Sequence, residues 1–584
     1  RSGLAWEHYS DRPIRFAFPA PTYGQVLQGL TALFAALLER ESSGKGQVVS
    51  ASLFEGALMW MTPHWYLAET WSPQLKAMVP KDPIPLIFRC RDGQLIHFML
   101  GSAGSLGKLH NVLGIHDENQ DMKASGLPTG GGDPKKFFGD IERYKPIIAQ
   151  RDSEELLAAM KAQGLAAEPV LAPGAAWDDP QVVHNGLIVE EADGTRRVGP
   201  PVVLHQLGPA APQHRKLGGK GPLDGLKVVD LGAIGAGPYG SKLLADLGAT
   251  VIKIEPLTGE LNRPFMRGFI GCNRAKKAIA IDLKSPEGVA LAQAICMDAD
   301  VVQHNFRPGV AKRLGVDAET LQAMKPELVV AETSGYGARG PKADQAGFDM
   351  IFQALAGHEH RTQDIDGDVA WFRSAMVDFT GGTFAAIGSL LALYGQARHG
   401  GRYAVFNNLL DAGVYLLSEL VQRPDGRFEG APPLEPTQLG FSSTDRIYAT
   451  ADGWIALAAR TVAQVDGLMR ALSLPFLPET WSHAIETAIA AAIRARPTAD
   501  VLAAFDRAGV WAEPCVRDAE SRYLDDPVLH AAGLTIECVD PDYGRLRQVG
   551  VLSRFSPTVP PSPSGCAPKV GADTDEILGW LVKD

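Results

Sequence analysis

The chain contains two copies of one sequence pattern, and this internal repeat constrains its fold more than any other feature. The stretch "QGLTALFAALLERESSGKGQVVSASLFEGAL" from Gln28 matches "AIGSLLALYGQARHGGRYAVFNNLLDAGV" from Ala386. Four further matches follow in the same order, for example "GLAAEPVL" from Gly164 with "GVWAEPCV" from Gly509. Repeats of this kind each form one structural unit. The repeat indicates either duplication for stability alone or a fused dimer, and we expect an intertwined pseudo-dimer within one chain.

The two copies are unequal in length. Residues 222–370 have no counterpart before residue 1, so the first copy begins in its middle. Because the chain also starts without Met, we expect a fragment of a longer parent protein. Residues 1–206 are then the C-terminal portion of a degenerate first copy, and residues 222–584 are a complete second copy. The intervening residues 207–221 are rich in Pro, Gly and Lys, which is typical of a linker.

The second copy predicts an α/β fold with two domains. Apolar runs typical of buried strands, such as 227–231 and 250–254, alternate with segments of helical spacing. This alternation is typical of a doubly wound, Rossmann-like parallel sheet. We expect this large domain to comprise residues 222–430 and 555–584. Residues 431–554 show paired strands and short helices, and we expect a smaller α+β domain there.

Composition excludes several classes of function. The 584 residues carry a net charge of −11, which argues against nucleic-acid binding. Six cysteines are scattered without C-x-x-C pairs, so neither a metal site nor a disulfide framework is indicated, and we expect a cytoplasmic location. The longest low-charge stretch, 379–394, contains several glycines and is shorter than a membrane span, so we expect no membrane partner.

A glycine-rich turn, "GAIGAGPYG", follows the first apolar run of the second copy. Gly235, Gly237 and Gly240 form a G-x-G-x-x-G pattern at the start of a helical segment. Glycines let the backbone approach a ligand closely, and the amides of a helix N-terminus attract anions. The pattern alone permits an NAD site, a site for another nucleotide-like ligand, or tight strand–helix packing without a ligand. No residues that would contact a nicotinamide accompany it.

Five ordered motifs of the second copy together resemble the family III CoA-transferases. They are "LDGLKVVDLGAIGAGPYGSKLLADLGATVIKIEP", "CNRAKKAIAIDLKSPEG", "VVQHNFRPGVAKRLG", "SGYGARGPKADQAGFDMIFQALAG" and "WFRSAMVDFTGGTFAAIGSLLAL". The resemblance extends over nearly all of residues 222–584 and recurs over 1–205. It implies an enzyme that transfers coenzyme A from an acyl-CoA thioester to a small carboxylic acid, with no tightly bound cofactor and no metal. A further homodimer of the pseudo-dimeric chain is compatible with it.

The resemblance also implies which residues approach coenzyme A. Lys and Arg side chains would form charge-assisted hydrogen bonds with its phosphates, and an aromatic ring would pack on its adenine. The residues carried over by position are Ile234, Gly235, Ala236, Arg263, Lys276, Asn305, Phe306 and Arg313. Some members have Arg directly after "KIE", where this chain has Pro256, and Arg263 or Arg267 would take its place. By composition alone, Lys276 would be expected on a solvated, charged edge.

Asp378 is the expected catalytic residue. It precedes a glycine-rich helix start in "AMVDFTGG". In the family that the chain resembles, the Asp at this place attacks the thioester and becomes a covalent aspartyl intermediate, a role that suits a carboxylate. Asp is also a favoured helix N-cap, so the residue alone fits a purely structural role. The match of Gly29 with Gly388 places Pro19 opposite Asp378, so we expect no nucleophile in the first copy and one active site per chain.

Neighbouring residues bear on the choice between related reactions. The α-methylacyl-CoA racemases share the fold and have His where this chain has Phe348, so racemase chemistry would lack its base. We expect Phe348 and Asp349 to face the substrate or support the site, and His358 and His360 to lie on the surface. Trp371 is either a core aromatic or a face for an onium substrate such as dimethylsulfoniopropionate, which some fused transferase–lyases use. An inactive CoA-binding or structural fragment is a further alternative.

Overall fold

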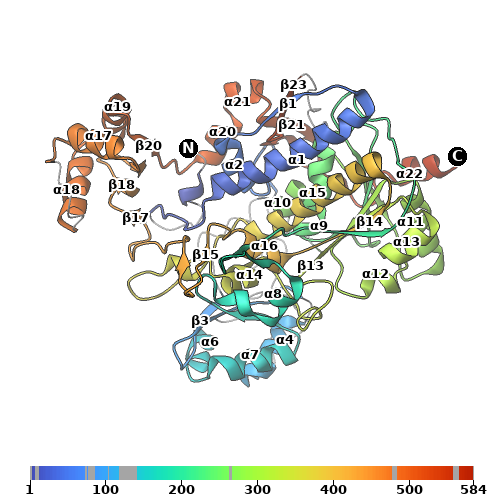
Figure 1. The fold of residues 1–584 in the computed structure, drawn as a ribbon, viewed down its shortest axis with the longest axis horizontal. Helices are drawn as coiled ribbons and strands as arrows, with labels where there is room; N and C mark the ends of the chain where they lie inside the picture. The colour runs from blue at the N-terminus through green and yellow to red at the C-terminus, as the bar shows by residue number, and fades with distance from the viewer. Residues whose placement is uncertain are drawn as a thin grey trace.

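The structure is a computed structural model of the chain. The structure describes residues 3–6, 12–72, 75, 86–102, 104–116, 141–261, 263, 266–475, 483–556 and 565–582. Figure 1 shows a central sheet with helices on both sides and two small domains that project from it, the first at the bottom of the view and the second at the left.

The helices and strands follow the two copies along the chain. In the first copy they are η1 (Leu4–Trp6), α1 (Ala20–Ser43), β1 (Val48–Ser50), α2 (Leu53–Met59), β2 (Tyr66–Ala68), β3 (Ile87–Arg89), β4 (Leu95–Met99), α4 (Ser105–Leu113), α6 (Ile141–Ile148), α7 (Ser153–Ala162), β5 (Ala166–Pro169), η2 (Ala175–Asp178), α8 (Pro180–Asn185), β6 (Ile188–Glu190), β7 (Arg196–Val198) and β8 (Val203–Gly208). In the large domain of the second copy they are β9 (Lys227–Asp230), α9 (Ala236–Asp246), β10 (Thr250–Glu255), α10 (Met266–Asn273), β11 (Lys277–Ala280), α11 (Pro286–Met297), β12 (Val301–His304), α12 (Val310–Arg313), α13 (Ala318–Met324), β13 (Val329–Ser334), α14 (Asp349–Ala356), η3 (His360–Thr362), α15 (Met376–His399), β14 (Arg402–Asn408) and α16 (Leu409–Tyr415). The remaining elements are β15 (Val421–Gln422), β16 (Phe428–Glu429), β17 (Gly440–Ser442), β18 (Asp445–Ala449), β19 (Trp454–Ala458), α17 (Val462–Leu472), α18 (His483–Arg494), α19 (Thr498–Ala508), β20 (Trp511–Pro514), α20 (Ala519–Leu524), α21 (Pro527–Ala531), β21 (Thr535–Asp540), β22 (Gly544–Val549), β23 (Arg554–Ser556) and α22 (Thr574–Leu581).

The central sheet confirms the predicted α/β class. Its seven strands lie in the order β11, β10, β9, β12, β13, β14, β8. The first six are parallel, and β8 pairs antiparallel with β14 at the edge. The six parallel strands follow the Rossmann order 3-2-1-4-5-6. In this order the chain reverses direction across the sheet between β9 and β12, so the loops after these two strands border one crevice.

Side chains of the parallel strands alternate between two helical layers. Val228 and Val301 face the core that contains α9 and α15. Val229 and Val302 face the opposite layer, which includes α11 and α13. Ile577 of the C-terminal helix α22 joins this second layer, so the end of the chain returns to the sheet domain. A parallel sheet covered on both faces explains the nearly continuous apolar strands of the sequence.

The two copies exchange strands reciprocally. β8 of the first copy pairs with β14 of the second, with Val203 opposite Phe406. β23 of the second copy pairs with β1 of the first, with Arg554 opposite Ser50. In the sequence repeat β8 matches β23 and β14 matches β1, so the two pairings have the same register. A second exchange joins β7 to β15 and β22 to β2.

Each copy also carries a small domain. In the first, β3, β4 and β5 form a sheet whose core includes α4, α6 and α7. In the second, β17 to β20 pack with α17, α18 and α19. The core of the second small domain runs from Tyr448 to Val510, whereas Leu534 and Val549 belong to the main core. It is therefore shorter than the predicted range 431–554, because β22 pairs with a strand of the first copy.

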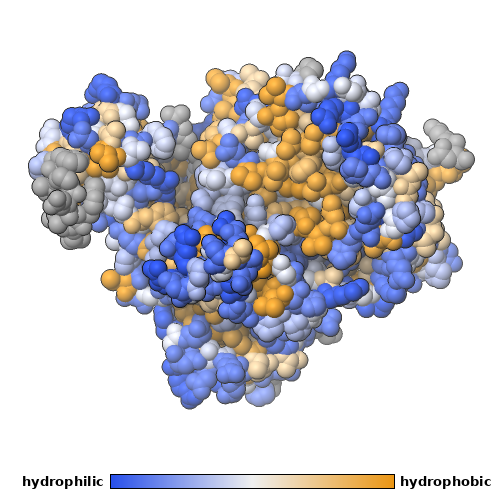
Figure 2. Space-filling view, in the orientation of Figure 1, coloured by the Kyte–Doolittle hydropathy of each residue, from blue (hydrophilic) through white to orange (hydrophobic). Residues whose placement is uncertain are grey.

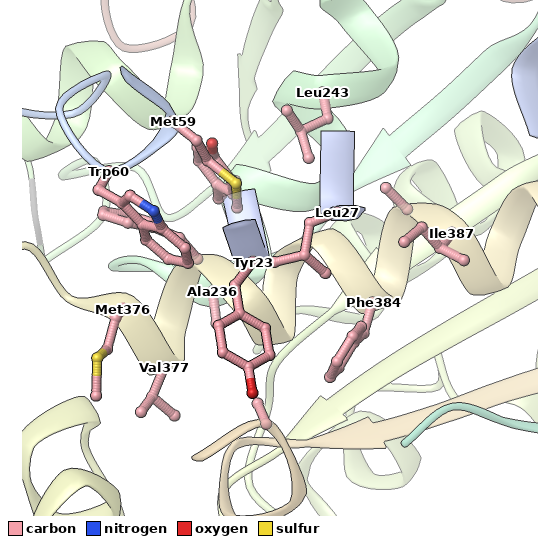
Figure 3. Close-up of a cluster of buried hydrophobic side chains, with 14 of the residues drawn as sticks. Tyr23, Leu27, Met59, Trp60, Ala236, Leu243, Met376, Val377, Phe384 and Ile387 are labelled. Carbon is pink, nitrogen blue, oxygen red and sulfur yellow. The ribbon is translucent and has the colours of Figure 1, made fainter. Parts of the chain in front are cut away.

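Helices α1 and α15 meet in the main core (Figure 3). Tyr23 and Leu27 of α1 lie close to Phe384 of α15, and Trp60 lies near Val377 at the start of α15. By length and hydropathy α15 could cross a membrane, but 89% of its most apolar window is buried inside the protein. A core helix passes the same test, and here the first copy covers α15.

The outer face of α1 is apolar. Val26 and Leu33 are each 42% exposed, and Figure 2 shows a broad hydrophobic area over the middle of α1. Helices α1 and α15 both have 24 residues, and they end at Gly44 and Gly400, each in the left-handed or positive-φ region. The two helices therefore correspond residue by residue with an offset of 356.

Two cysteines differ from the sequence-based expectation. Cys538 of β21 and Cys566 form a disulfide across 28 residues. The sequence indicated no disulfide framework, and this single bridge was not predicted, because the C-terminal segment returns to β21 only in the fold. Cys90, Cys272 and Cys296 are free and buried. The cytoplasmic location stays a prediction.

Candidate active site

The glycine-rich loop after β9 lies at the crevice of the sheet and is held in one conformation. Ile234 has a φ of 68°, which is rare for a β-branched residue. Asn305, directly after β12, holds the loop: its Oδ1 accepts from Ala233 N at 2.9 Å, and its Nδ2 donates to Ala233 O at 2.8 Å. Gly235 is the N-cap of α9, and Ala236 is its first residue. The structure therefore brings together four residues that were predicted to approach coenzyme A.

A network of buried charges lies beneath this loop. Lys276 Nζ donates to Asp230 Oδ2 at 2.7 Å, and Lys253 Nζ donates to Glu260 Oε2 at 3.3 Å and to Gly232 O at 2.9 Å. Burial acts to raise the pKa of Asp230, but Lys276 and Lys253 outweigh it and lower that pKa. Lys276 is buried and also bonds to backbone and side-chain oxygens nearby, so its ammonium supports the loop rather than facing solvent.

Asp378 lies in the first turn of α15 and faces the same loop. A Cβ at position 235 would collide with Asp378 Oδ2, so the carboxylate rests against the backbone of Gly235. The N-cap of α15 is Ala375, whose φ is 47°, and not Asp378. Asp378 is therefore not the N-cap of this helix, and the purely capping role is excluded. Burial raises the pKa of Asp378 well above its ordinary value, and the charge of Asp349 raises it further.

Asp349 provides the cap that Asp378 does not. Its Oδ2 accepts from the amides of Val377 at 2.7 Å and Asp378 at 3.2 Å. Gln353 orients this carboxylate: its Nε2 donates to Asp349 Oδ1, and it exchanges two hydrogen bonds with the backbone of Phe372. Burial raises the pKa of Asp349 to about 6, although these hydrogen bonds oppose the rise. Asp349 thus fixes the start of the helix that carries Asp378.

The other predicted CoA residues divide into two groups. Phe306 follows β12, and its ring stacks on that of His304 at 5.3 Å. Arg313, at the end of α12, is exposed and accessible to a phosphate. Arg263 instead pairs with Glu255, with 2.7 Å between Arg263 Nε and Glu255 Oε2. In this structure Arg263 therefore neutralises the acid at the end of β10.

The small domain of the first copy forms a wall beside α14. The ring of Phe348 lies so close to Gly101 that a Cβ there would be 2.6 Å from it. His97 of β4 and Glu359 form a buried pair, with 2.7 Å between Nδ1 and Oε1. The ring of Trp371 lies 6.2 Å from the ring of His97. Phe348 and Trp371 thus border the interface between the two copies.

The structure corrects the expected counterpart of the nucleophile. The match of Gly29 with Gly388 pointed to Pro19, but the helix ends and the paired strands require an offset of 356. The counterpart of Asp378 is then Thr22, which is exposed on α1. The first copy lacks a carboxylate at either position, so the inference of a single nucleophile is unchanged.

The histidines after the racemase-like motif were expected on the surface. His358 is buried instead, its Nε2 donates to Gly413 O at 2.8 Å, and burial lowers its pKa to about 3. His360 is half-buried. Within the described part of the chain, no group of three or more His, Cys, Asp or Glu side chains could hold a metal ion.

Four residues that shape the site were not predicted from the sequence: Asp230, Lys253, Glu260 and Gln353. Asp230 ends β9 and Lys253 lies within β10, and both are charged residues next to the apolar runs of buried strands. A charge in a fully buried strand needs a partner, so this break in the pattern was a usable signal. Glu260 and Gln353 follow ordinary polar patterns, and nothing in the sequence distinguished them.

Comparison with known proteins identifies the family. Residues 2–215 and 223–574 match the sequence pattern described as CoA-transferase family III. The chain is 32% identical over 383 residues to a succinyl-CoA–D-citramalate CoA-transferase of Chloroflexus aurantiacus, covering 62% of this chain and 94% of that protein. It is 28% identical over 387 residues to the succinyl-CoA:glutarate CoA-transferase of Mus musculus, covering 62% and 87% of the two chains. A crystal structure of a CAIB/BAIF family protein from Brucella suis has a TM-score of 0.54 and 26% identity, covering 62% of this chain and 100% of that chain. The chain therefore belongs to CoA-transferase family III and is a CoA-transferase.

Proposed function

We propose that this enzyme transfers coenzyme A between carboxylic acids through a covalent intermediate on Asp378. The observation that supports this most directly is the position of Asp378, whose carboxylate rests against Gly235 at the crevice of the parallel sheet. Ligands of doubly wound sheets bind at this crevice. A carboxylate there can attack a thioester while the acyl group stays activated throughout.

The proposed reaction has four balanced steps. The ionised Asp378 attacks the thioester carbonyl of the donor, which gives a mixed anhydride and the thiolate of coenzyme A. The thiolate attacks the aspartyl carbonyl, which gives an aspartyl thioester and releases the donor acid. The acceptor carboxylate attacks this thioester, which gives a second anhydride and frees the thiolate again. The thiolate finally attacks the acceptor carbonyl, so acyl-CoA leaves and Asp378 is regenerated.

The residues around Asp378 control its charge and position. The first step requires the ionised form, and burial together with Asp349 raises the pKa of Asp378. A carboxylate with a raised pKa is more basic once it is ionised. A buried carboxylate also has few bound waters to lose before it attacks, so it is a better nucleophile. The two carboxyl groups interact, so they titrate as a pair. Asp349 acts on Asp378 both through this charge and through its bonds to the first amides of α15.

We further propose that the two copies form an intertwined pseudo-dimer with one active site. The reciprocal pairing of β8 with β14 and of β23 with β1, in one register, supports this arrangement. Thr22 lies at the place of the nucleophile in the first copy. The role of the first copy is then to shape the site of the second, since its small domain contacts Phe348.

The names of the relatives suggest the substrate class. They use succinyl-CoA with D-citramalate or glutarate, and a relative from Acetobacter aceti that is 30% identical over 325 residues is an acetyl-CoA:oxalate CoA-transferase. We therefore propose a short acyl-CoA donor and a small dicarboxylic acid acceptor. Phe348 in the place of the racemase His argues against the racemase alternative, which needs a second base.

Trapping the intermediate tests this function. The enzyme is incubated with succinyl-CoA, quenched with hydroxylamine, and digested for mass spectrometry. We expect a hydroxamate on Asp378. Asp378→Ala should abolish CoA transfer to glutarate, D-citramalate and oxalate while CoA binding in calorimetry persists. Asp411→Asn is the matched control, because Asp411 is also a buried carboxyl group with a pKa raised to about 6.

Two outcomes would contradict the proposal. Transfer that survives in Asp378→Ala would exclude Asp378 as the nucleophile. Binding of NADH without binding of CoA would instead favour the dinucleotide alternative for the glycine-rich loop.

A further inference from the structure

The end of the chain packs against the loops that flank α10. We call residues 565–573, which precede α22, the C-terminal strap. Gly565 O accepts from Ala275 N at 3.2 Å at the start of the strap. At its other end, Asp573 N donates to Ala278 O at 3.0 Å, and Asp573 Oδ2 accepts from Ala278 N at 2.8 Å. The strap therefore borders both the loop after α10 and the edge strand β11.

The middle of the strap covers Arg263, one of the residues predicted to approach coenzyme A. Arg263 Nε and Nη2 both donate to the carboxylate of Glu255. The remaining nitrogen, Nη1, donates to Pro568 O of the strap at 3.1 Å. A Cβ at Gly259 would lie 2.5 Å from Arg263 Cδ and 3.0 Å from Val570 Cγ2, so the strap packs directly on this arginine. Each of the three guanidinium nitrogens therefore has an acceptor inside the protein.

A disulfide joins the start of the strap to the rest of the fold. Cys566 is bonded to Cys538 of β21, and β21 pairs with β22, which also pairs with β2 of the first copy. Lys569 of the strap also pairs with Asp542 in the turn between β21 and β22, but both side chains are exposed, and such pairs contribute little. The disulfide is therefore the principal tie between the strap and β21.

The two bonded cysteines differ in their access to solvent. Cys538 is 6% exposed, whereas Cys566 is half-buried. A thiolate attacks a disulfide at the more accessible sulfur, so we expect exchange to begin at Cys566. Disulfides of proteins in reducing compartments are usually transient, catalytic or redox-sensing rather than permanent. With the predicted cytoplasmic location, a reversible role fits this bridge.

We propose that the disulfide between Cys538 and Cys566 is a redox switch for coenzyme A affinity, and that a dithiol reductant opens it. While the bridge is intact, Pro568 O occupies Nη1 of Arg263. When the bridge is broken, the start of the strap is released, and Nη1 becomes available to a phosphate oxygen of coenzyme A. Arg263 stays paired with Glu255 through its other two nitrogens, so the release leaves no buried carboxylate without its partner.

The exchange consumes one dithiol and transfers two electrons. One thiolate of the reductant attacks Sγ of Cys566, which forms a mixed disulfide and displaces the thiolate of Cys538. The second thiolate of the reductant then attacks the reductant's own sulfur in the mixed disulfide, and Cys566 leaves as a thiolate. The two cysteine thiolates take up the two protons that the reductant has lost, and the reductant ends as a cyclic disulfide.

Ligand affinity in the two redox states tests the switch. The full 584-residue chain is treated with dithiothreitol or with glutathione disulfide and desalted. Each sample is titrated in a calorimeter with S-methyl-coenzyme A, a thioether that cannot itself exchange with a disulfide. Digestion without reduction, followed by mass spectrometry, establishes whether Cys538 and Cys566 are joined. We expect the reduced chain to bind about tenfold more tightly, since it gains a charge-assisted hydrogen bond to a phosphate.

Three variants make the result specific. Cys566→Ser cannot form the bridge, so it should bind the thioether like the reduced chain after either treatment. Arg263→Lys keeps a cation beside Glu255 but lacks the additional donor nitrogen, so its affinity should not respond to the redox state. Cys515→Ser is the matched control, because Cys515 is a half-buried free thiol outside the strap. This variant should respond like the unmodified chain.

Three outcomes would overturn the proposal. They are equal affinity of the reduced and oxidised chains, weaker binding by the reduced chain, and a redox response that persists in Arg263→Lys. A bridge that does not form after treatment with glutathione disulfide also overturns it. Asp378→Ala should keep the redox response, because the assay measures binding and not transfer. Failure of the switch and failure of the proposed nucleophile are therefore distinguishable.

Discussion

Replacing Asp349 by Asn tests the electrostatic account of the active site. Asp349 Oδ2 lies 3.2 Å from the backbone nitrogen of Asp378. An aspartate carboxylate lies about 3 Å from its own amide nitrogen, so the two carboxylates are about 6 Å apart or closer. At an effective dielectric constant of about 20, two charges at that distance repel by about 3 kcal/mol, or about two pH units. Because Asp378 has some solvent contact, we expect a smaller effect, about one pH unit.

The direction of the effect follows from the two pKa values. Asp349 has a pKa of about 6 and is ionised at neutral pH, where it raises the pKa of Asp378 beyond the effect of burial. Asp349→Asn removes this charge, while the amide oxygen can still accept from Val377. The pKa of Asp378 therefore falls, and this proposed nucleophile stays ionised at lower pH. The acidic limb of activity should shift to lower pH.

The assay is kcat/KM against pH for transfer from succinyl-CoA to glutarate. The acidic limb reports the essential base of the free enzyme, so its midpoint should move down by about one pH unit in Asp349→Asn. Asp411→Asn is the control: burial raises the pKa of Asp411 to about 6, but its partners are Asn185 and Asn408. In that variant the acidic limb of kcat/KM should keep its wild-type midpoint. A limb that stays in place or moves to higher pH in Asp349→Asn refutes the electrostatic account.

Four further predictions concern stability and geometry. Because the folded-state pKa of Asp378 is raised, wild-type stability falls as pH rises through it, so Asp378→Asn should raise Tm near pH 8 and have little effect near pH 3.5. Gly388→Ala meets packed valine side chains and should cost about 1–3 kcal/mol of unfolding free energy in urea melts, whereas Gly29→Ala meets no atom within 4 Å and should gain about 0.5–1 kcal/mol. Lys276→Met breaks a fully buried ion pair and should cost about 3–5 kcal/mol, whereas a residue that only bound phosphate would change the KM for acyl-CoA alone. Gly235→Ala displaces the carboxylate of Asp378, the proposed nucleophile, and should lower kcat about a hundredfold with little change in Tm, and unaltered kcat would contradict this role.

Much of the fold was predictable because the repeat and the strand pattern depend on local sequence. Buried parallel strands need continuous apolar runs, and helices between them need apolar spacing, so both are visible in a single sequence. The repeat also indicated that each strand near the end of one copy has a match in the other. The strand pairings themselves are visible only in the folded chain. They join Val203 to Phe406 and Arg554 to Ser50, residues that lie about two hundred and five hundred positions apart in the sequence.

The parts that could not be predicted depend on contacts between distant segments. Lys276 matches a family position, but its burial depends on the fold bringing it to Asp230 at the end of β9, 46 residues earlier in the chain. Arg263 likewise meets Glu255 only because the chain turns back after β10. The disulfide of Cys538 depends on the return of the C-terminal segment. In each case the residue type was informative, and the partner was decided by tertiary packing.

The glycine-rich loop shows why a motif can indicate a site and still leave its ligand open. A Cβ at Gly237 would lie 2.6 Å from Oδ1 of Asn305, the residue after β12 that holds this loop, and one at Gly240 would lie 2.5 Å from Gly382 O. A Cβ at Gly235 would displace the carboxylate of Asp378. All three glycines are thus required by contacts within the protein, before any phosphate is considered. The pattern therefore cannot separate an NAD site from a CoA site, whereas the residue packed against its first glycine can. Hydride transfer has no use for a nucleophilic carboxylate, whereas the proposed reaction through Asp378 requires one within reach of the nucleotide loop.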